Sequence, residues 1–102
     1  MFRHVVMMRF TPDSTPAQVA TMQERLLQLP ARIPEIKSYV LGDDARVNAG
    51  NYDFVIVADL ADVDDYLVYR DHPDHQAVIA ESIRPILAER VAVQHHFPQE
   101  PA

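Results

Sequence analysis

The sequence contains no cysteine and no tryptophan, and only two of its 102 residues are glycine. Without cysteine the chain cannot form a disulfide, a thiolate metal site or a cysteine nucleophile. Two glycines are too few for a glycine-rich phosphate-binding loop, and no G-x-S-x-G motif occurs, so nucleotide binding and serine-hydrolase chemistry are not expected. The apolar run after Phe2 is interrupted at Arg9, which is too short for a signal or spanning segment. We therefore expect a cytoplasmic protein.

Basic residues are also scarce relative to acidic ones, and the formal net charge is −6. Proteins that bind nucleic acid or an anionic membrane need a basic surface to neutralise phosphates, so neither partner is expected. Apolar residues make up 48% of the chain and charged residues 24%, the balance of a globular domain. We predict one folded domain over residues 1–97 and a flexible, proline-containing tail over residues 98–102.

Apolar periodicity and helix caps predict the order of the elements. Thr15, Pro16 and Gln18 have the spacing of an N-cap, a first-turn proline and a capping box. Asp62, followed by Asp65, can cap a second helix in the same way. The pattern predicts strands at 2–10, 33–41, 51–60 and 90–97 and helices at 15–29, 62–69 and 73–84, with Pro30 ending the first helix and Pro85 kinking or restarting the last.

This order is the split β-α-β-β-α-β arrangement of a ferredoxin-like α+β fold, in which both helices cover one face of an antiparallel sheet. The other face is then bare. Alternation along the strands places Val5, Met7, Val55 and Val57 on it. A two-fold homodimer that packs two such faces together would bury them in a closed barrel, so the expected partner is a second copy of the chain.

The segment from Tyr69 to His75 contains the candidate catalytic residues. Pro73 suits the first position of a helix, which Asp71 or His72 would cap. His75 then lies in the first turn, where free N–H groups and the helix dipole disfavour a positive charge and keep it neutral near pH 7. Tyr69 and a neutral His75 form a usable acid/base pair for carbonyl chemistry. The alternative is that both histidines only cap and pack.

A hollow between the sheet and the helices is the expected ligand site, because small-molecule sites are apolar hollows with a few polar groups. The alternative is an ordinary packed core, in which aliphatic residues at these spacings are common. A small hydrophobic or carbonyl-containing ligand would suit the hollow. The expected ligand-binding residues are His4, Val6, Met8, Phe54, Ile56, His72, Val91, Val93 and His95, beside the catalytic pair.

No metal or other cofactor is expected. His72 and His75 could share an ion with Asp71, but Pro73 places His72 outside the regular helix, and an H-x-x-H spacing alone is weak evidence. The neighbouring histidines at 95 and 96 point to opposite faces of a strand and do not easily share one ion.

The chain resembles the stress-responsive dimeric alpha/beta-barrel (Dabb) family over about residues 2–97. The most specific matching element is H-P-x-H preceded by a tyrosine, which spans residues 69–75. The resemblance implies a ferredoxin-like subunit and a homodimer whose two sheets form the central barrel. The other matching residues are His4-Val5-Val6, Phe10, Ile36-Lys37-Ser38, Gly42, Tyr52-Asp53 and Arg84-Pro85.

The resemblance also implies two possible functions. Most family members have no assigned reaction, and the first expectation is a homodimeric Dabb protein with a small apolar ligand pocket. The second is a cofactor-independent cyclase or isomerase, because the family's plant olivetolic acid cyclase closes a polyketide with residues that match Tyr69 and His75. His4 matches a pocket histidine. The chain departs from the pattern at Gln94-His95-His96, where an acidic residue is common, and monooxygenases with related barrels share the fold.

Overall fold

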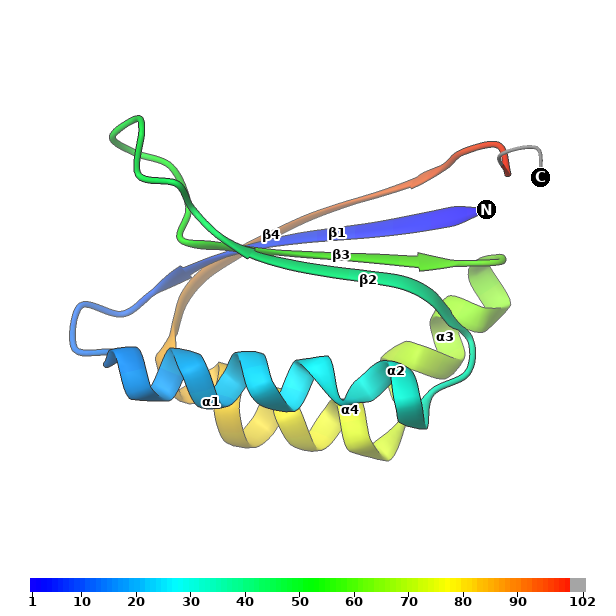
Figure 1. Ribbon diagram of the computed structural model, residues 1–102, viewed down its shortest axis with the longest axis horizontal. Coiled ribbons are helices and arrows are strands. Elements are labelled where there is room, and N and C mark those ends of the chain that lie inside the picture. Colours follow the sequence, from blue (N-terminus) through cyan, green and yellow to red (C-terminus); the bar gives the residue numbers. More distant parts are fainter. Residues whose placement is uncertain (100–102) are drawn as a thin grey trace.

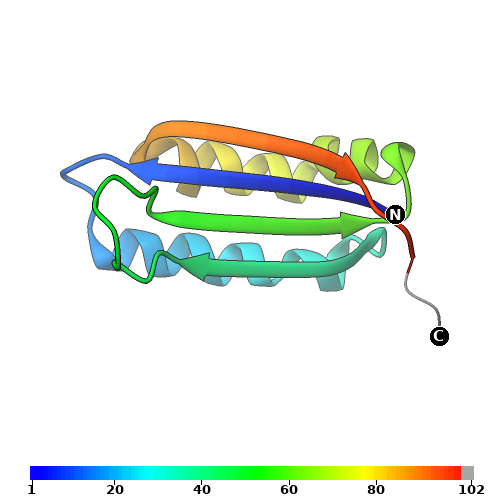
Figure 2. The ribbon, with the colours of Figure 1, turned by 90° about the horizontal axis from the view of Figure 1, so that it is seen from above.

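Four antiparallel strands form one sheet in the computed structural model, which describes residues 1–99. They are β1 (Phe2–Phe10), β2 (Ile36–Asp43), β3 (Phe54–Leu60) and β4 (Leu87–His96). The strands lie in the order β2-β3-β1-β4, so the first and third strands occupy the centre (Figure 2). This is the ferredoxin-like order, and the predicted fold class is confirmed.

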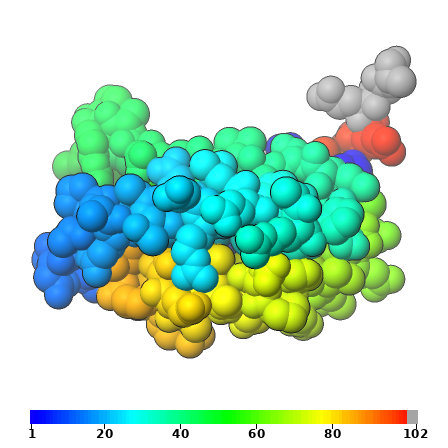
Figure 3. Space-filling view, turned by 60° about the horizontal axis from the view of Figure 1, so that its bottom comes forward, coloured from blue at the N-terminus to red at the C-terminus, as the bar shows by residue number. Residues whose placement is uncertain are grey.

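All helices lie on one side of this sheet (Figure 1). They are α1 (Pro16–Leu27), α2 (Leu29–Arg32), α3 (Val63–Asp71) and α4 (Pro73–Val78), followed by a π-helical turn η1 (Ile79–Ile83) and a 3-10 turn η2 (Arg84–Ile86). The space-filling view shows α1 packed along α4 and η1 (Figure 3). Arg25 of α1 joins them by donating to the Ser82 hydroxyl at 2.8 Å.

The three helix caps form as the sequence predicts. The Thr15 hydroxyl accepts from the Gln18 N–H, and the Gln18 side chain accepts from the Thr15 N–H, which completes the capping box. The Asp62 carboxylate accepts from the Asp65 N–H at 2.8 Å. His72 caps α4, and its Nδ1 accepts from the Asp74 N–H at 3.1 Å. The caps therefore fix where each helix begins.

The predicted boundaries are least accurate beside prolines. Pro30 does not end the helical path: α1 stops at Leu27, and Pro30 lies in the first turn of α2, where its missing N–H is not needed. The second strand begins at Ile36, after Pro34, rather than at Ile33. Before Pro85 the helix widens into the π-turn η1, because a proline ring cannot fit against the preceding turn of an α-helix.

Two other strand starts differ. The third strand begins at Phe54 rather than Asn51, and the side chain of Asp53, just before it, accepts from the Phe10 N–H at 2.8 Å. The last strand begins at Leu87 rather than Arg90. Part of the tail predicted at 98–102 lies outside the described residues.

The core lies between the sheet and the helices. The β1 side chains that face the helices include Val6 and Met8, which are buried together with Met22 and Leu26 of α1. The faces predicted for β1 and β3 are confirmed by this burial. None of the helices in residues 1–99 has both the length and the apolar character that a bilayer span needs.

No helix of residues 1–99 lies over the opposite face of the sheet, as predicted (Figure 1). Val5 pairs with Val57 and Met7 pairs with Val55 across the two central strands. We call this surface the uncovered face, and it also includes Val40, Val91 and Val93, all of which are exposed. The loop between β2 and β3 rises on the same side of the sheet (Figure 1). One subunit therefore exposes a continuous apolar sheet surface.

Candidate functional site

The last strand presents to the helices a different set of side chains from the one that we expected. Leu87 pairs with Phe10 on the helix side, but Glu89 pairs with Arg9 on the uncovered face, because a β-bulge shifts the register between them. The extra residue reverses the alternation for the rest of β4. The prediction was therefore wrong for three residues: Val91, Val93 and His95 lie on the uncovered face, opposite Met7, Val5 and Arg3, and away from the proposed pocket.

The helix-side residues of β4 are instead Arg90, Ala92 and Gln94, which pair with Met8, Val6 and His4. Their β1 partners are buried, whereas these three are exposed. The helices thus cover β1 but leave this edge strand open. We call Arg90, Ala92 and Gln94 the open strip.

His75 stands at the junction of α3 and α4. Its ring stacks on Tyr69 with 4.2 Å between centroids and an interplanar angle of 28°. Its Nδ1 lies 3.0 Å from the Arg70 carbonyl oxygen, and because a carbonyl only accepts, Nδ1 carries the hydrogen. Nε2 of the neutral ring is then the atom that can take a proton. Burial, with smaller contributions from the charges of His72 and Arg90, lowers the pKa of His75, so the ring is neutral near pH 7.

Tyr69 is buried and does not point freely into a hollow. Its hydroxyl lies 2.9 Å from the hydroxyl of Tyr39 on β2, and either can be the donor. Burial, reinforced by the Tyr39 hydroxyl, raises the pKa of Tyr69, so the group keeps its proton at any physiological pH. Burial likewise raises the pKa of Tyr39 to about 12. When Tyr39 donates, the Tyr69 proton is free to be donated elsewhere.

His4 is only 5% exposed and lies on β1 beneath the open strip. Its Nδ1 lies 2.9 Å from the Gln94 amide nitrogen, which can only donate, so the neutral ring carries its hydrogen on Nε2. Burial, the charge of Arg90 and the nearby His75 lower the pKa of His4 to about 4. At neutral pH this site therefore contains two uncharged histidines.

One residue that the sequence analysis did not single out connects these groups. The Tyr66 ring lies 4.9 Å from the His4 ring and 6.3 Å from the Tyr69 ring, measured between centroids. Tyr66 precedes Tyr69 by three residues on α3, a spacing that puts both on one helix face, so the helical pattern contained the information. The rings of His4, Tyr66, Tyr69 and His75 form a continuous column, which we call the aromatic column.

The apolar residues of β1 and β3 that were expected to line a pocket belong to the buried core. Val6, Met8, Phe54 and Ile56 are each buried, with exposed fractions of 5% or less. This is the core arrangement that was the alternative to a pocket lining. His72, also expected to bind ligand, uses Nδ1 to cap α4. Within residues 1–99 no cluster of three His, Asp or Glu side chains is arranged to hold a metal ion.

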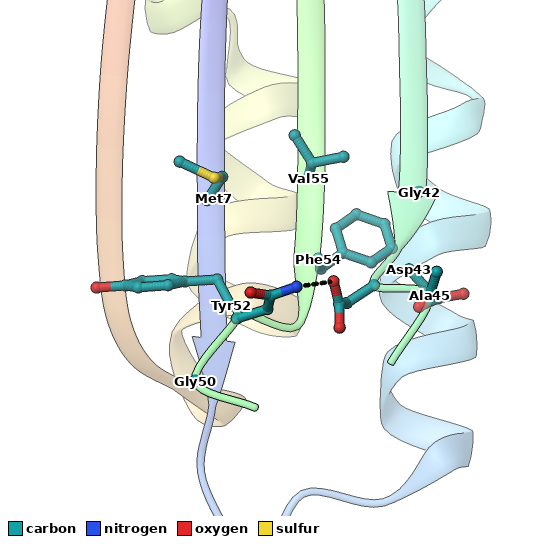
Figure 4. A pocket seen from close by; sticks show the side chains of 10 residues that line it. Met7, Gly42, Asp43, Ala45, Gly50, Tyr52, Phe54 and Val55 are labelled. Atoms are coloured by element: carbon teal, nitrogen blue, oxygen red, sulfur yellow. Dashed lines mark hydrogen bonds between the residues drawn. The ribbon is translucent and has the colours of Figure 1, made fainter. Parts of the chain in front are cut away.

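Four hollows stand out among those on the surface of residues 1–99, and none of these four is lined by His4, Tyr69 or His75. One of about 490 Å³ lies on the uncovered face beside the β2–β3 loop. Figure 4 shows Met7 and Val55 on the strands above it and Tyr52 at one side. His4, Tyr69 and His75 are thus outside these four hollows, and His4 lies beside Gln94 of the open strip.

Arg90 is the second residue that the sequence analysis missed. Arg90 lies on the helix side of β4, opposite Met8, and after burial its positive charge is a further cause of the lowered pKa of His4 and of His75. It makes no ion pair with any carboxylate of residues 1–99. If the position of the bulge were known, alternation along β4 would place Arg90 on the helix side of the sheet. No residue in the sequence clearly signals the bulge.

A family model described as the stress responsive A/B barrel domain, Dabb, matches residues 2–96. The chain belongs to the Dabb family. The resemblance described above is thus confirmed, and the β-α-β-β-α-β Dabb domain accounts for nearly all of the described residues. No curated protein sequence is significantly similar to this chain.

Solved structures agree with this Dabb assignment. A dimeric ferredoxin-like protein of unknown function from Thermobifida fusca YX is 48% identical, with a TM-score of 0.87 over 94% of this chain and 90% of the other. A dimeric protein of unknown function from Bacteroides fragilis is 23% identical, with a TM-score of 0.79 over 94% and 95%. A hydroxynitrile lyase from Passiflora edulis is 18% identical, with a TM-score of 0.83 over 99% and 96%. The last two similarities concern the fold alone.

Proposed function

We propose that this Dabb domain acts as a homodimer whose uncovered faces pack against each other. The carrying observation is the apolar sheet surface around Val5, Val57 and Val93, which none of the helices in the described part of the chain covers. Packing of two such surfaces removes both from water and gives a closed, barrel-like assembly. The structurally similar proteins from Thermobifida fusca and Bacteroides fragilis are described as dimeric, which supports the proposal.

The dimer is tested by introducing a charge into the proposed interface. Val93 is 61% exposed in the subunit, so Val93→Lys leaves the folded subunit intact but places an ammonium group between the sheets. The wild type should sediment as a dimer at micromolar concentration and Val93→Lys should shift toward the monomer. Val63→Lys, at an exposed valine of α3, is the matched control and should remain dimeric. A monomeric wild type would contradict the proposal.

Each subunit, in the same proposal, binds a small and largely apolar carbonyl compound beside His4, Tyr69 and His75. The tautomer of His75 supports this part of the proposal, because the Arg70 carbonyl accepts the hydrogen bond from Nδ1–H and leaves Nε2 free to act as a base. The ligand would enter over the open strip, where β4 lacks a helical cover. Its apolar part would lie against Tyr66 and Ala92, with the carbonyl group directed at Tyr69.

The catalytic version of this function is proton abstraction next to the carbonyl group. His75 Nε2 takes the proton, the C–H electron pair moves into the C–C bond, and the carbonyl π pair moves onto oxygen as an enolate. The Tyr69 hydroxyl donates to that oxygen while Tyr39 donates to Tyr69, which stabilises the developing charge in a site of low polarity. Such a step belongs to isomerases and to aldol-type cyclases, and it needs no cofactor. The hydroxynitrile lyase of similar fold supports the idea that this scaffold can hold an enzyme site.

A non-catalytic ligand-binding protein is the second candidate, favoured by the dense packing around Tyr69. Phenylacetone in deuterium oxide separates the two, because its methylene hydrogens exchange only when the enolate forms. The catalytic version predicts exchange above the buffer rate by the wild type and loss of that excess in His75→Gln. His96→Gln, which removes an exposed histidine at the end of β4, is the control. Binding without exchange would establish the non-catalytic candidate, and absence of binding would refute both.

A further inference from the structure

The arginines of this protein differ in whether they form an ion pair with a carboxylate. Six of them form an ion pair within residues 1–99, and the remaining two, Arg84 and Arg90, form none there. Of these two, Arg90 lies on the same face of β4 as Gln94, whose amide donates to His4 of the aromatic column. The paired arginines are Arg3, Arg9, Arg25, Arg32, Arg46 and Arg70.

Neighbouring acidic residues are engaged elsewhere. Glu89 precedes Arg90 in the strand, but it lies on the uncovered face, where Arg9 and the Tyr52 hydroxyl contact its carboxylate. Asp71 and Asp74, near His75 in the chain, pair with Arg70 and Arg32. In a chain with a net charge of −6, an arginine without a carboxylate partner beside two uncharged histidines is therefore unusual.

The position of Arg90 suits an anion that arrives from outside. Arg90 pairs with Met8 across the two strands. Gln94, two residues beyond Ala92 on the same face of β4, donates a hydrogen bond to His4. The guanidinium is exposed, so a ligand can reach it without a change in the fold. A planar guanidinium binds a carboxylate through two parallel N–H···O bonds, which fixes the orientation of the ligand as well as adding affinity.

We infer that Arg90 is the carboxylate-binding residue of this site and that the ligand is a carbonyl compound carrying a carboxylate group. This inference rests on the proposed function and narrows its ligand class. Arg90 would hold the carboxylate over the open strip, while the carbonyl group reaches Tyr69 and the adjacent C–H reaches His75. The carboxylate then replaces the acidic partner that Arg90 lacks among residues 1–99.

Two probes that differ only in the anionic group test the inference. Phenylpyruvate and phenylacetone share the benzyl ketone, but the carboxylate of the first is a methyl group in the second. The wild-type dimer should bind phenylpyruvate more tightly than phenylacetone, as measured by calorimetry or NMR titration. Arg90→Gln should weaken phenylpyruvate about tenfold or more and change phenylacetone less than about twofold. Arg84→Gln, which removes the same charge elsewhere, should change neither.

The outcomes separate this inference from the function on which it rests. Equal wild-type affinity for the two probes, or an equal loss of both in Arg90→Gln, would overturn the carboxylate assignment while leaving the ketone site standing. If Arg84→Gln weakened phenylpyruvate binding as much as Arg90→Gln does, the effect would come from the net charge of the protein. That result would also overturn the carboxylate assignment. If the wild type binds neither probe, the proposed site and the inference fall together.

Discussion

Acidification should destabilise this protein through His4. The ring is 5% exposed, and its Nδ1 accepts from the Gln94 side chain, so the fold holds it in the neutral form. Arg90 and His75 add to this preference, although burial is the larger cause of the lowered pKa. Protonation of His4 would place a second positive charge next to Arg90 and remove the acceptor that Gln94 uses. The perturbation is therefore a fall in pH, or a substitution that removes the titrating group.

The sign and the size follow from the two pKa values. In the unfolded chain His4 titrates near 6.5, whereas in the fold its pKa is about 4, so between these values only the unfolded state binds the proton. The stabilisation is fully present above pH 6.5 and is lost as the pH falls toward 4. At about 1.36 kcal/mol per pKa unit the whole effect is about 3 kcal/mol, of which about 2 kcal/mol is lost between pH 7 and pH 5.

The assay is urea unfolding at pH 7 and pH 5, at one protein concentration because association also affects stability. The drop in unfolding free energy should be smaller in His4→Gln than in the wild type by about 2 kcal/mol. His96→Gln, which removes an exposed histidine, should retain the wild-type drop. An NMR titration should place the midpoint of His4 near pH 4. A midpoint near 6.5, or equal drops in the wild type and His4→Gln, would refute the reasoning.

Three further predictions concern the aromatic column and the core. If His75 is the base, the deuterium-exchange rate should rise with pH to a plateau and reach half its maximum below pH 6.5. The reason is that burial lowers the pKa of this histidine and only its neutral form accepts a proton. A rate that falls as the pH rises toward 6.5 would contradict the assignment. Tyr39→Phe leaves the buried Tyr69 hydroxyl without its partner and should lower the unfolding free energy by about 1–2 kcal/mol. The surface change Tyr52→Phe should cost about 0.5 kcal/mol or less. Met22→Ala opens a cavity at a fully buried position and should lower the free energy of unfolding by about 2–5 kcal/mol, measured by thermal or urea unfolding. Leu27, also on α1, is 57% exposed, and Leu27→Ala should lower it by well under 1 kcal/mol.

The elements could be predicted because their signals are local. Capping side chains identify the starts of α1, α3 and α4, and alternation identifies both faces of β1. The boundaries at Pro30 and Pro34 were less accurate, since a proline excludes one conformation without stating which alternative the chain adopts. The bare sheet face was predictable as well, because two helices cannot cover both sides of a four-stranded sheet.

The site was only partly predictable, because its composition depends on register. Tyr69 and His75 were identified by a contiguous segment, and the structure places their rings in contact. Val91 and Val93 were assigned to the wrong face, since hydrophobicity favoured turning the valine face of β4 toward the helices and no residue marks the bulge. The partner of Tyr69, Tyr39, lies thirty positions away on another strand, so only the folded arrangement brings the two hydroxyls together.

The bulge near Ala88 has a wider consequence for this domain. After the bulge, β4 has two faces of different character, one with Arg90 and Gln94 and one with Val91 and Val93, and the bulge determines which of these faces is turned toward the helices. Leu87 and Glu89 already pair with the adjacent residues Phe10 and Arg9, so deleting Ala88 would make the ladder regular and leave Arg90 and the valines on their present faces. A ladder that instead paired Ala88 with Arg9 would turn Arg90 toward the uncovered face and the valines toward the helices, so the proposed ligand site and the proposed dimer face depend on the same local irregularity.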